Sequence, residues 1–336
     1  MRKMSKKIIV SVLTLVLTVV ALGTTTYAWF TVGGTVATDE LEMKVTSGVG
    51  LEIAYLHSGL NEESGDLRWV KTITADRIYG YLYNDYYGFL TGHSDLDDVT
   101  DNIGNYATAW NNTFVMDAFT SANGVDMQYL NEDGDDLVPT ADPKGGYIQF
   151  TLAFRTKENL DPSNGLQLYL NELTYSSTSI NWKPEVDFTE VGGNTFKATD
   201  SPKPFFAVNG ARISLEDGLN GGAKVFEKAN GTGNVQLSDN EPNWAEGAHA
   251  YYQAVTTRDL ESVFGNTGTA YVAAVTKTAL DPSGEVVAEF VDGTGGVYRY
   301  ATVTIRIYLE GFDSETFNAI FDDVIRARFG FNIDIS

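Results

Sequence analysis

Alternation of apolar and polar side chains with a period of two is the feature that most constrains the fold of this chain. In ATVTIRIYL (301–309) and VIRARFGFNIDI (324–335), every second residue is apolar. The same pattern recurs in YIQFTLAFR (147–155), GLQLYLNEL (165–173) and ARISL (211–215), and in shorter form at Leu41–Met43–Val45 and Leu51–Ile53. Successive side chains of a strand point to opposite faces, so this pattern is typical of antiparallel strands with one face on a core. The sequence therefore predicts a mainly β protein, built as a β-sandwich.

Helices are expected to be few and short. We predict one at Asp313–Phe321, and others around Arg258–Phe264 and in the tyrosine-rich stretch 76–90. The stretch Gly92–Asp142 is dense in Asp, Asn, Gly and Thr, which predicts long surface excursions. Glycine pairs at 192–193, 221–222 and 295–296 mark hairpins or loops. We expect one domain over residues 29–336, with a loop insertion around 76–142.

The N-terminus has the layout of a secretory signal peptide. Four basic residues precede an uncharged apolar run, residues 8–22, and small residues follow, with Thr26 and Ala28 at the −3 and −1 positions of a cut before Trp29. An uncleaved anchor is the alternative, but it needs about 20 apolar residues to span the hydrocarbon. We therefore predict a signal peptide over residues 1–28, cleavage by a signal peptidase, no stable membrane span afterwards, and a secreted or cell-surface product.

Composition excludes several classes of function. The chain has no cysteine, so disulfides, thiolate metal sites and cysteine nucleophiles are excluded. It has 45 acidic and 23 basic residues, a formal net charge of −22. Because nucleic-acid binding depends on basic side chains that displace counterions, we expect no nucleic-acid partner.

No enzyme motif is present in the sequence. The three histidines, His57, His93 and His249, form no H-E-x-x-H pattern, and there is no G-x-S-x-G elbow, Walker loop or dinucleotide-binding glycine motif. A pair of carboxylates placed for glycoside hydrolysis stays open, since separation in space decides that chemistry. Several aromatic residues suit sugar or peptide stacking, although core packing is the simpler interpretation: Tyr81, Tyr83, Tyr86, Tyr87, Trp110 and Trp244. We predict no enzymatic activity and no bound cofactor, and the one possibility left open is calcium.

Two acidic clusters are candidate calcium sites. Calcium takes six to eight oxygen ligands, and loop sites of millimolar affinity suffice outside cells. The candidate ligands are Asp95, Asp97, Asp98 and Asp101 in one cluster and Asp133, Asp135 and Asp136 in the other. The second cluster lies in NEDGDD (131–136), where glycine is the fourth residue. An EF-hand loop has its glycine at the sixth position, so this segment is not an EF-hand. Solvated surface charge is the alternative interpretation.

The segment GTTTYAWFTVGGTVATDELEM (23–43) resembles the start of the camelysin and TasA-like exported proteins of Gram-positive bacteria. Gly23, Thr24 and the run Ala28–Thr31 carry the resemblance. A looser similarity lies in IRIYLEGFDSETFNAI (305–320), which is similar to a closing strand and short helix of exported proteins. The resemblance implies a jelly-roll-like β-sandwich, built into biofilm or surface fibres, in which the segment after the signal peptide completes the sheet of the next subunit. Some members carry a metallopeptidase label, but this chain has no zinc motif and that activity is not expected.

The residues after the cleavage site permit such a role. Trp29–Thr38 is rich in β-branched residues, and Phe30, Val32 and Val36 alternate with smaller or polar residues. Extended segments of this kind add to exposed sheet edges. We therefore expect a secreted structural protein that self-associates, with Trp29, Phe30, Val32 and Val36 in the assembly strand. A monomeric binding module or adhesin, and an extracellular carbohydrate- or peptide-acting hydrolase, are the alternatives.

Overall fold

A computed structural model describes residues 41–45, 50–88, 102–130, 137–157, 165–190, 192–227, 247–258, 284–313, 315–316, 320 and 323–333. The predicted signal peptide, the predicted assembly strand Trp29–Thr38 and all seven candidate calcium ligands lie outside these residues.

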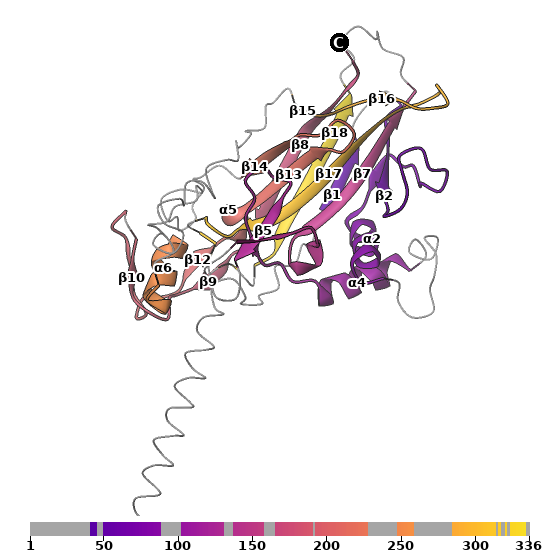
Figure 1. Ribbon diagram of the computed structural model, residues 1–336. Coiled ribbons are helices and arrows are strands. Elements are labelled where there is room, and N and C mark those ends of the chain that lie inside the picture. The colour runs from indigo at the N-terminus through magenta and orange to yellow at the C-terminus, as the bar shows by residue number, and fades with distance from the viewer. Residues whose placement is uncertain are drawn as a thin grey trace, which may run out of the picture.

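The described chain is a β-sandwich, as the alternation predicts (Figure 1). A five-stranded sheet runs in the order β15-β8-β18-β1-β3, with bounds Glu285–Glu289, Gln167–Ser177, Ile325–Ile333, Leu41–Val45 and Thr72–Ile73. A seven-stranded sheet runs in the order β14-β13-β17-β7-β2, with bounds Ala223–Glu227, Ala211–Asp217, Arg299–Glu310, Ile148–Thr156 and Glu52–Leu56, and β4 (Ala118–Phe119) and β16 (Val291–Asp292) also pair with β17. Three two-stranded pairs complete the strands: β5 (Met127–Leu130) with β6 (Leu137–Thr140), β9 (Ile180–Trp182) with β12 (Lys203–Phe205), and β10 (Phe188–Thr189) with β11 (Thr195–Phe196).

The core lies between the two sheets. Along β17 the residues Val303, Ile305 and Ile307 are fully buried, and β17 pairs antiparallel with β13 on one side and β7 on the other. The inner faces meet directly, since the rings of Phe154 on β7 and Phe331 on β18 lie 4.9 Å apart. The alternate apolar residues of β18 are also buried, as the pattern predicts: Ile325, Ala327, Phe329, Phe331 and Ile333. Hairpins form at the three glycine pairs, between β10 and β11, β13 and β14, and β16 and β17.

One long side of the sandwich is closed by residues 70–73. The backbone amide of Ile53 on β2 donates to the carbonyl of Val70 at 2.8 Å, and the amide of Val70 donates back at 2.9 Å. Two residues later, β3 pairs with Met43 and Lys44 of β1. The chain thus passes from the edge of one sheet to the edge of the other. β1 itself runs parallel to β18, an exception to the predicted antiparallel arrangement.

The described helices are short, as predicted, and one of them lies where the sequence places it. They are α2 (Ala75–Tyr87), α4 (Ile103–Thr113), α5 (Ala207–Gly210), α6 (Gly247–Thr256) and the 3₁₀ helix η1 (Pro143–Gly145). α2 matches the tyrosine-rich stretch. The helix expected at Arg258–Phe264 lies, apart from Arg258, outside the described residues, and α6 ends before it, at Thr256. At Asp313–Phe321 the described residues form a turn, closed by the amide of Thr316 donating to the carbonyl of Asp313, and do not form a helix.

The stretch Gly92–Asp142 is more structured than its polar composition predicts. Its described part contains α4 and the strands β4, β5 and β6. Tyr106 and Trp110 of α4 are buried, and Trp110 stacks on Phe114 with ring centroids 4.3 Å apart. The helices α2 and α4 pack closely because Gly80 faces Ile103 without a side chain of its own (Figure 1). Burial of these aromatic side chains therefore stabilises regular structure in a stretch whose polar composition predicts loops.

A single buried carboxylate, that of Asp323, ties together the segments at one end of the sandwich. Its Oδ1 accepts hydrogen bonds from the backbone amides of Thr178, Ser179 and Val324 and from the Thr178 hydroxyl, at 2.6–2.9 Å. Its Oδ2 accepts the amide of Ala207, at the start of α5, at 2.9 Å. The Asp323 carboxylate thus accepts hydrogen bonds from backbone amides that belong to no strand.

Replacement of Asp323 by alanine should destabilise the protein by roughly 3–5 kcal/mol, because several buried backbone donors would lose their acceptor. Urea unfolding of the variant and the parent measures this difference. Asp66 is exposed, so Asp66→Ala is the control and should change the unfolding free energy by less than about 0.5 kcal/mol. Equal stability of both variants would contradict the assigned role of Asp323.

Candidate functional site

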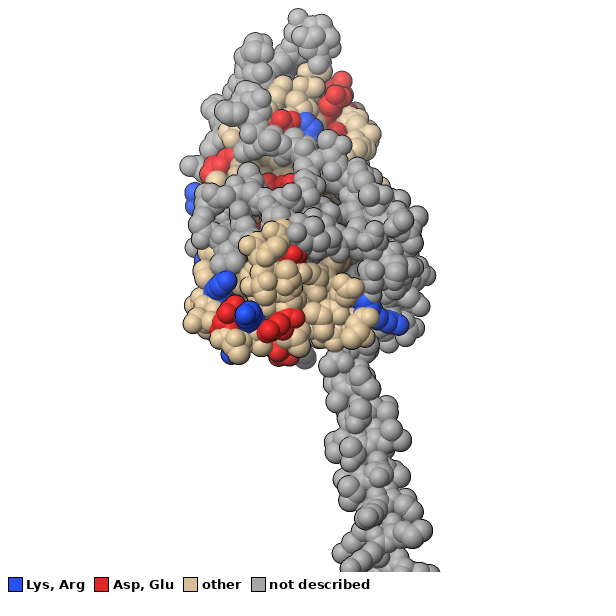
Figure 2. All heavy atoms as spheres, turned by 90° about the vertical axis from the view of Figure 1, so that its left-hand side faces the viewer, with Lys and Arg blue, Asp and Glu red and all other residues tan. Residues whose placement is uncertain are grey.

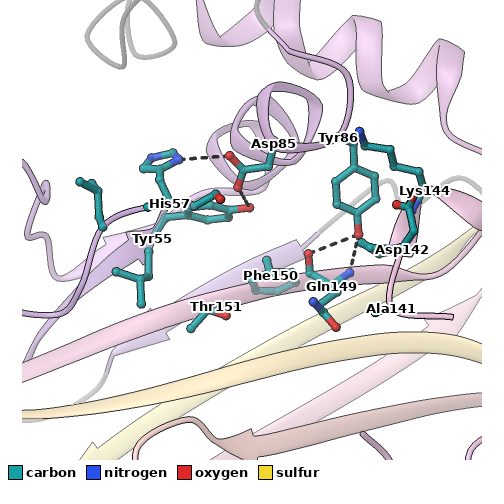
Figure 3. Close-up of a pocket in the computed structure, with 15 residues that line it drawn as sticks. Tyr55, His57, Asp85, Tyr86, Ala141, Asp142, Lys144, Gln149, Phe150 and Thr151 are labelled. Atoms are coloured by element: carbon teal, nitrogen blue, oxygen red, sulfur yellow. Dashed lines mark hydrogen bonds and ion pairs between the residues drawn. The ribbon is translucent and has the colours of Figure 1, made fainter. Parts of the chain in front are cut away.

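A pocket of about 690 Å³ opens at the edge of the seven-stranded sheet, beside the end of β2 (Figure 3). Four segments line it: residues 55–60, 85–86, 141–144 and 149–151. They come from β2 and the turn after it, from the C-terminal end of α2, from the start of η1 and the two residues before it, and from β7. Its size is in the range of small-ligand sites.

The pocket exists because β2 is shorter than its neighbour β7. The two strands pair from Glu52–Arg155 to Leu56–Thr151, and in that register Ser58 would lie opposite Gln149. The chain instead turns away, with the amide of Leu60 donating to the carbonyl of His57 and Gly59 at a φ of 87°, which glycine adopts without strain. On this side, the edge of β7 from Phe150 back to Ile148 therefore has no strand partner among the described residues.

The hydroxyl of Tyr86, from α2, takes the place of that missing strand. The backbone amide of Gln149 donates to it at 2.7 Å, and the hydroxyl in turn faces the carbonyls of Tyr147 and Gln149 at 3.2 and 3.3 Å. Burial raises the pKa of Tyr86 well above its ordinary value, which keeps the phenol protonated and able to donate. The hydroxyl of Tyr86 thus supplies hydrogen bonds to backbone groups at a sheet edge where β2 no longer pairs with β7.

Asp85 forms one wall of the pocket and holds two neighbouring rings. Its Oδ2 accepts the Tyr55 hydroxyl at 2.8 Å, and its Oδ1 lies 3.5 Å from Nδ1 of His57. The His57 ring is packed against Tyr55 and edge-on to Tyr81, with centroids 4.8 and 4.6 Å away. Burial, and then the charge of Asp85, raises the pKa of Tyr55, so this phenol also stays protonated.

The opposite wall carries a lysine. Asp142 caps η1 by accepting the backbone amide of Lys144 at 3.1 Å. The side chain of Lys144 lies on the Tyr86 side of the pocket, across from His57 and Asp85 (Figure 3). Lys144 is exposed, and no described carboxylate lies within ion-pair distance of its Nζ.

A second candidate region is the side of the sandwich opposite residues 70–73. Here the edge strands β14 and β15 border a groove of about 360 Å³, lined by residues 215, 217, 220–224 and 286–289. No strand among the described residues pairs with the outer side of either one. Lys224 and Glu285 bridge the two edges at 2.5 Å, and Asp217 accepts the amide of Glu289 at 2.9 Å. In Figure 1 these strands lie on the side away from β2.

A buried cluster of charges lies on the outer face of β13 and β17. Nη2 of Arg212 lies 2.8 Å from Asp313 and 2.9 Å from Glu227, and Glu310 adds a third carboxylate. Burial raises the pKa of Asp313 to about 7, although Arg212 opposes the shift. Burial of Asp117 likewise raises its pKa to about 6.

The histidines and aromatic residues singled out from the sequence have mixed positions. His57 is in the pocket, and His249 is buried in α6 with its ring 5.8 Å from that of Phe312. Tyr81, Tyr86 and Trp110 are buried and serve the core, whereas Tyr87 is 39% exposed. His93 and Trp244 lie outside the described residues. Over the described ranges, no group of three or more His, Asp or Glu side chains is arranged to hold a metal ion.

The roles of Asp85 and Lys144 could not be read from the sequence, since neither lies in a recognisable motif. A local signal exists only for Tyr86, which stands in a helical stretch with several other tyrosines.

Replacement of Tyr86 by phenylalanine should leave the Gln149 amide and two carbonyls without their partner, and so destabilise the protein by about 1–3 kcal/mol. Hydrogen exchange should report faster opening at the Gln149 amide. Tyr87→Phe, one residue away and exposed, is the matched control and should have little effect. Unchanged exchange at Gln149 would contradict the assigned role.

Asp313 should make the protein less stable as pH rises. Its folded pKa of about 7 lies above its ordinary value of 3.8, so its stabilising contribution is complete below about pH 4 and is lost as pH rises through 7. Asp313→Asn should flatten the fall in unfolding free energy between pH 4 and 7, as measured by urea unfolding at several pH values. Asp117→Asn should flatten it only up to about pH 6. A pH dependence identical to that of the parent would contradict the shift at Asp313.

Over the described residues no helix is long and apolar enough to cross a membrane. Comparison of the chain with protein-family models, curated proteins and solved structures finds no match to any of them.

Proposed function

We propose that the chain is a non-enzymatic structural protein, exported and secreted or held at the cell surface, which assembles with itself by strand addition. In this proposal Trp29–Thr38 of one copy is the donated strand. The open side between β14 and β15 of the next copy receives it.

The observation that carries the proposal is the difference between the two long sides of the sandwich. One side is closed by residues 70–73, which pair with both sheets. The other ends in two edge strands, β14 and β15, that border one groove. An unpaired sheet edge offers a row of backbone donors and acceptors to another chain.

The dimensions of the groove suit an extended segment. β14 and β15 are five residues long each, or about 17 Å at the rise of a strand. Trp29–Thr38 has ten residues, enough to follow either edge along its whole length. Its alternating apolar residues Phe30, Val32 and Val36 would face the core between the sheets and set the register.

The contacts that now bridge the groove are weak enough to be exchanged. Both side chains of the Lys224–Glu285 ion pair are partly exposed, at 37% and 21%, and such pairs contribute little to stability. On the face seen in Figure 2, which is the left side of Figure 1, described Lys and Arg side chains lie beside Asp and Glu side chains. Interspersed charges of this kind reduce the repulsion that the net negative charge would otherwise cause between copies.

A monomeric binding module is the second candidate, and the pocket beside His57 favours it. The two functions differ in a measurable way, because a binding module stays monomeric with its open side unused.

Closing the open side should prevent assembly. The chain has no cysteine, so Lys224→Cys and Glu285→Cys can be joined by a short bis-maleimide linker in a protein that begins at Trp29. We expect the parent to form fibres by electron microscopy and light scattering, the linked variant to remain monomeric, and a chain that begins at residue 39 to remain monomeric as well.

Each single cysteine variant, treated with the same reagent, is the control and should still elongate. Elongation of the linked variant at the rate of these controls would rule out the β14–β15 side as acceptor. If the parent never polymerises, the binding module replaces the fibre subunit.

A further inference from the structure

We propose that the pocket beside His57 binds a small zwitterion, a free amino acid or a short peptide, with the ammonium group on Asp85 and the carboxylate on Lys144. This inference does not depend on assembly of the protein. It rests on two side chains of opposite charge that line the same pocket. Among the described residues Asp85 has no Lys or Arg within ion-pair distance, only His57 at 3.5 Å, and Lys144 has no carboxylate within ion-pair distance.

Asp85 is a carboxylate with unused capacity. Two oxygens offer about four acceptor positions. The Tyr55 hydroxyl occupies one at 2.8 Å, the Asn84 amide lies at 3.3 Å, and His57 approaches to 3.5 Å. No described Lys or Arg lies within ion-pair distance, and the Asp85 side chain is 20% exposed. A ligand ammonium would supply the missing cation and form charge-assisted hydrogen bonds.

Lys144 is the complementary group. Its backbone amide is fixed by the side chain of Asp142, which places the residue at the rim of the pocket. That hydrogen bond engages Asp142 locally, and within the described part of the chain no carboxylate forms an ion pair with the Lys144 Nζ. A ligand carboxylate can therefore reach an ammonium that does not first have to break an internal contact.

The floor between the two charges is suited to the rest of such a ligand. Tyr55, Tyr86 and Phe150 line the pocket there, and the hydroxyl protons of both tyrosines are already donated within the protein, to Asp85 and to the carbonyls of Tyr147 and Gln149. The volume of about 690 Å³ accommodates an amino acid up to a short peptide. The side-chain oxygen of Gln149 is already engaged within the protein, because Oε1 accepts a hydrogen bond from Nε of Arg306 at 2.7 Å.

Ligands with a single charge fit less well. A simple cation bound at Asp85 would leave Lys144 facing a like charge across the pocket, and a simple anion bound at Lys144 would face Asp85. Only a dipolar ligand satisfies both walls, and specificity of this kind comes from the repulsion of the wrong ligand as much as from attraction of the right one.

The test is a binding series by calorimetry at low ionic strength, using leucine and the peptides Ala-Leu and Ala-Ala-Leu. Each is compared with its N-acetylated form, which lacks the ammonium, and its C-terminal amide, which lacks the carboxylate. We expect at least one zwitterion to bind and each blocked form to bind at least tenfold more weakly. The member of the series that binds best distinguishes a free amino acid from a peptide.

Two variants assign the charges. Lys144→Gln should weaken binding of the zwitterion about tenfold but should not weaken binding of its amide, whereas Asp85→Asn should weaken binding of the zwitterion but not of the acetylated form. Lys197→Gln and Asp66→Asn, at exposed positions outside the pocket, are the matched controls and should bind as the parent does. Thermal unfolding confirms that the variants fold.

Failure of every zwitterion to bind would overturn the proposal. Binding that neither blocked ligands nor the two pocket variants weaken would overturn it too, because the charges would then have no part in recognition.

Discussion

The pairing of β17 with β13 and β7 is the interaction on which the rest of the structure depends. β17 is twelve residues long and alternates strictly, so its inner face supplies Val303, Ile305 and Ile307 to the core, while its outer face carries Arg306, Tyr308 and Glu310. The inner set fixes the register, because a slip of one residue would turn every apolar side chain outward. The side chains on the outer face of β17 are also covered. The charged cluster around Arg212 and the segment from β4 to η1 pack over them.

Differences in strand length around this centre create the two candidate sites. β7 has nine residues and β2 only five, and the pocket lies where β2 turns away. Tyr86 protects the uncovered backbone of β7 there, so the sheet edge is satisfied without being filled by a strand. On the far side, β14 and β15 end their sheets without such a cover among the described residues. We therefore propose a small ligand for the first site and a chain segment for the second.

Much of the fold could be predicted from the sequence, because strand periodicity is a local signal. The strands over 147–155, 211–215, 301–309 and 325–333 appear where the alternation places them. The candidate pocket could not be predicted, since Asp85 meets Tyr55 across 30 positions and Tyr86 meets Gln149 across 63. Only the packing of α2 against the sheet brings these side chains together. The residues predicted for calcium binding and for assembly lie outside the described chain and stay predictions.

The central claim is that assembly adds a backbone partner to the open side of the sandwich, and hydrogen–deuterium exchange of assembled and monomeric protein tests it most directly. The account predicts that amides of residues 223–227 or 285–289 gain protection on assembly, because a donated strand pairs with β14 or β15, while amides of β17 stay equally protected in both states. Unchanged exchange along both edges in assembled material, or new protection confined to β2, would contradict it.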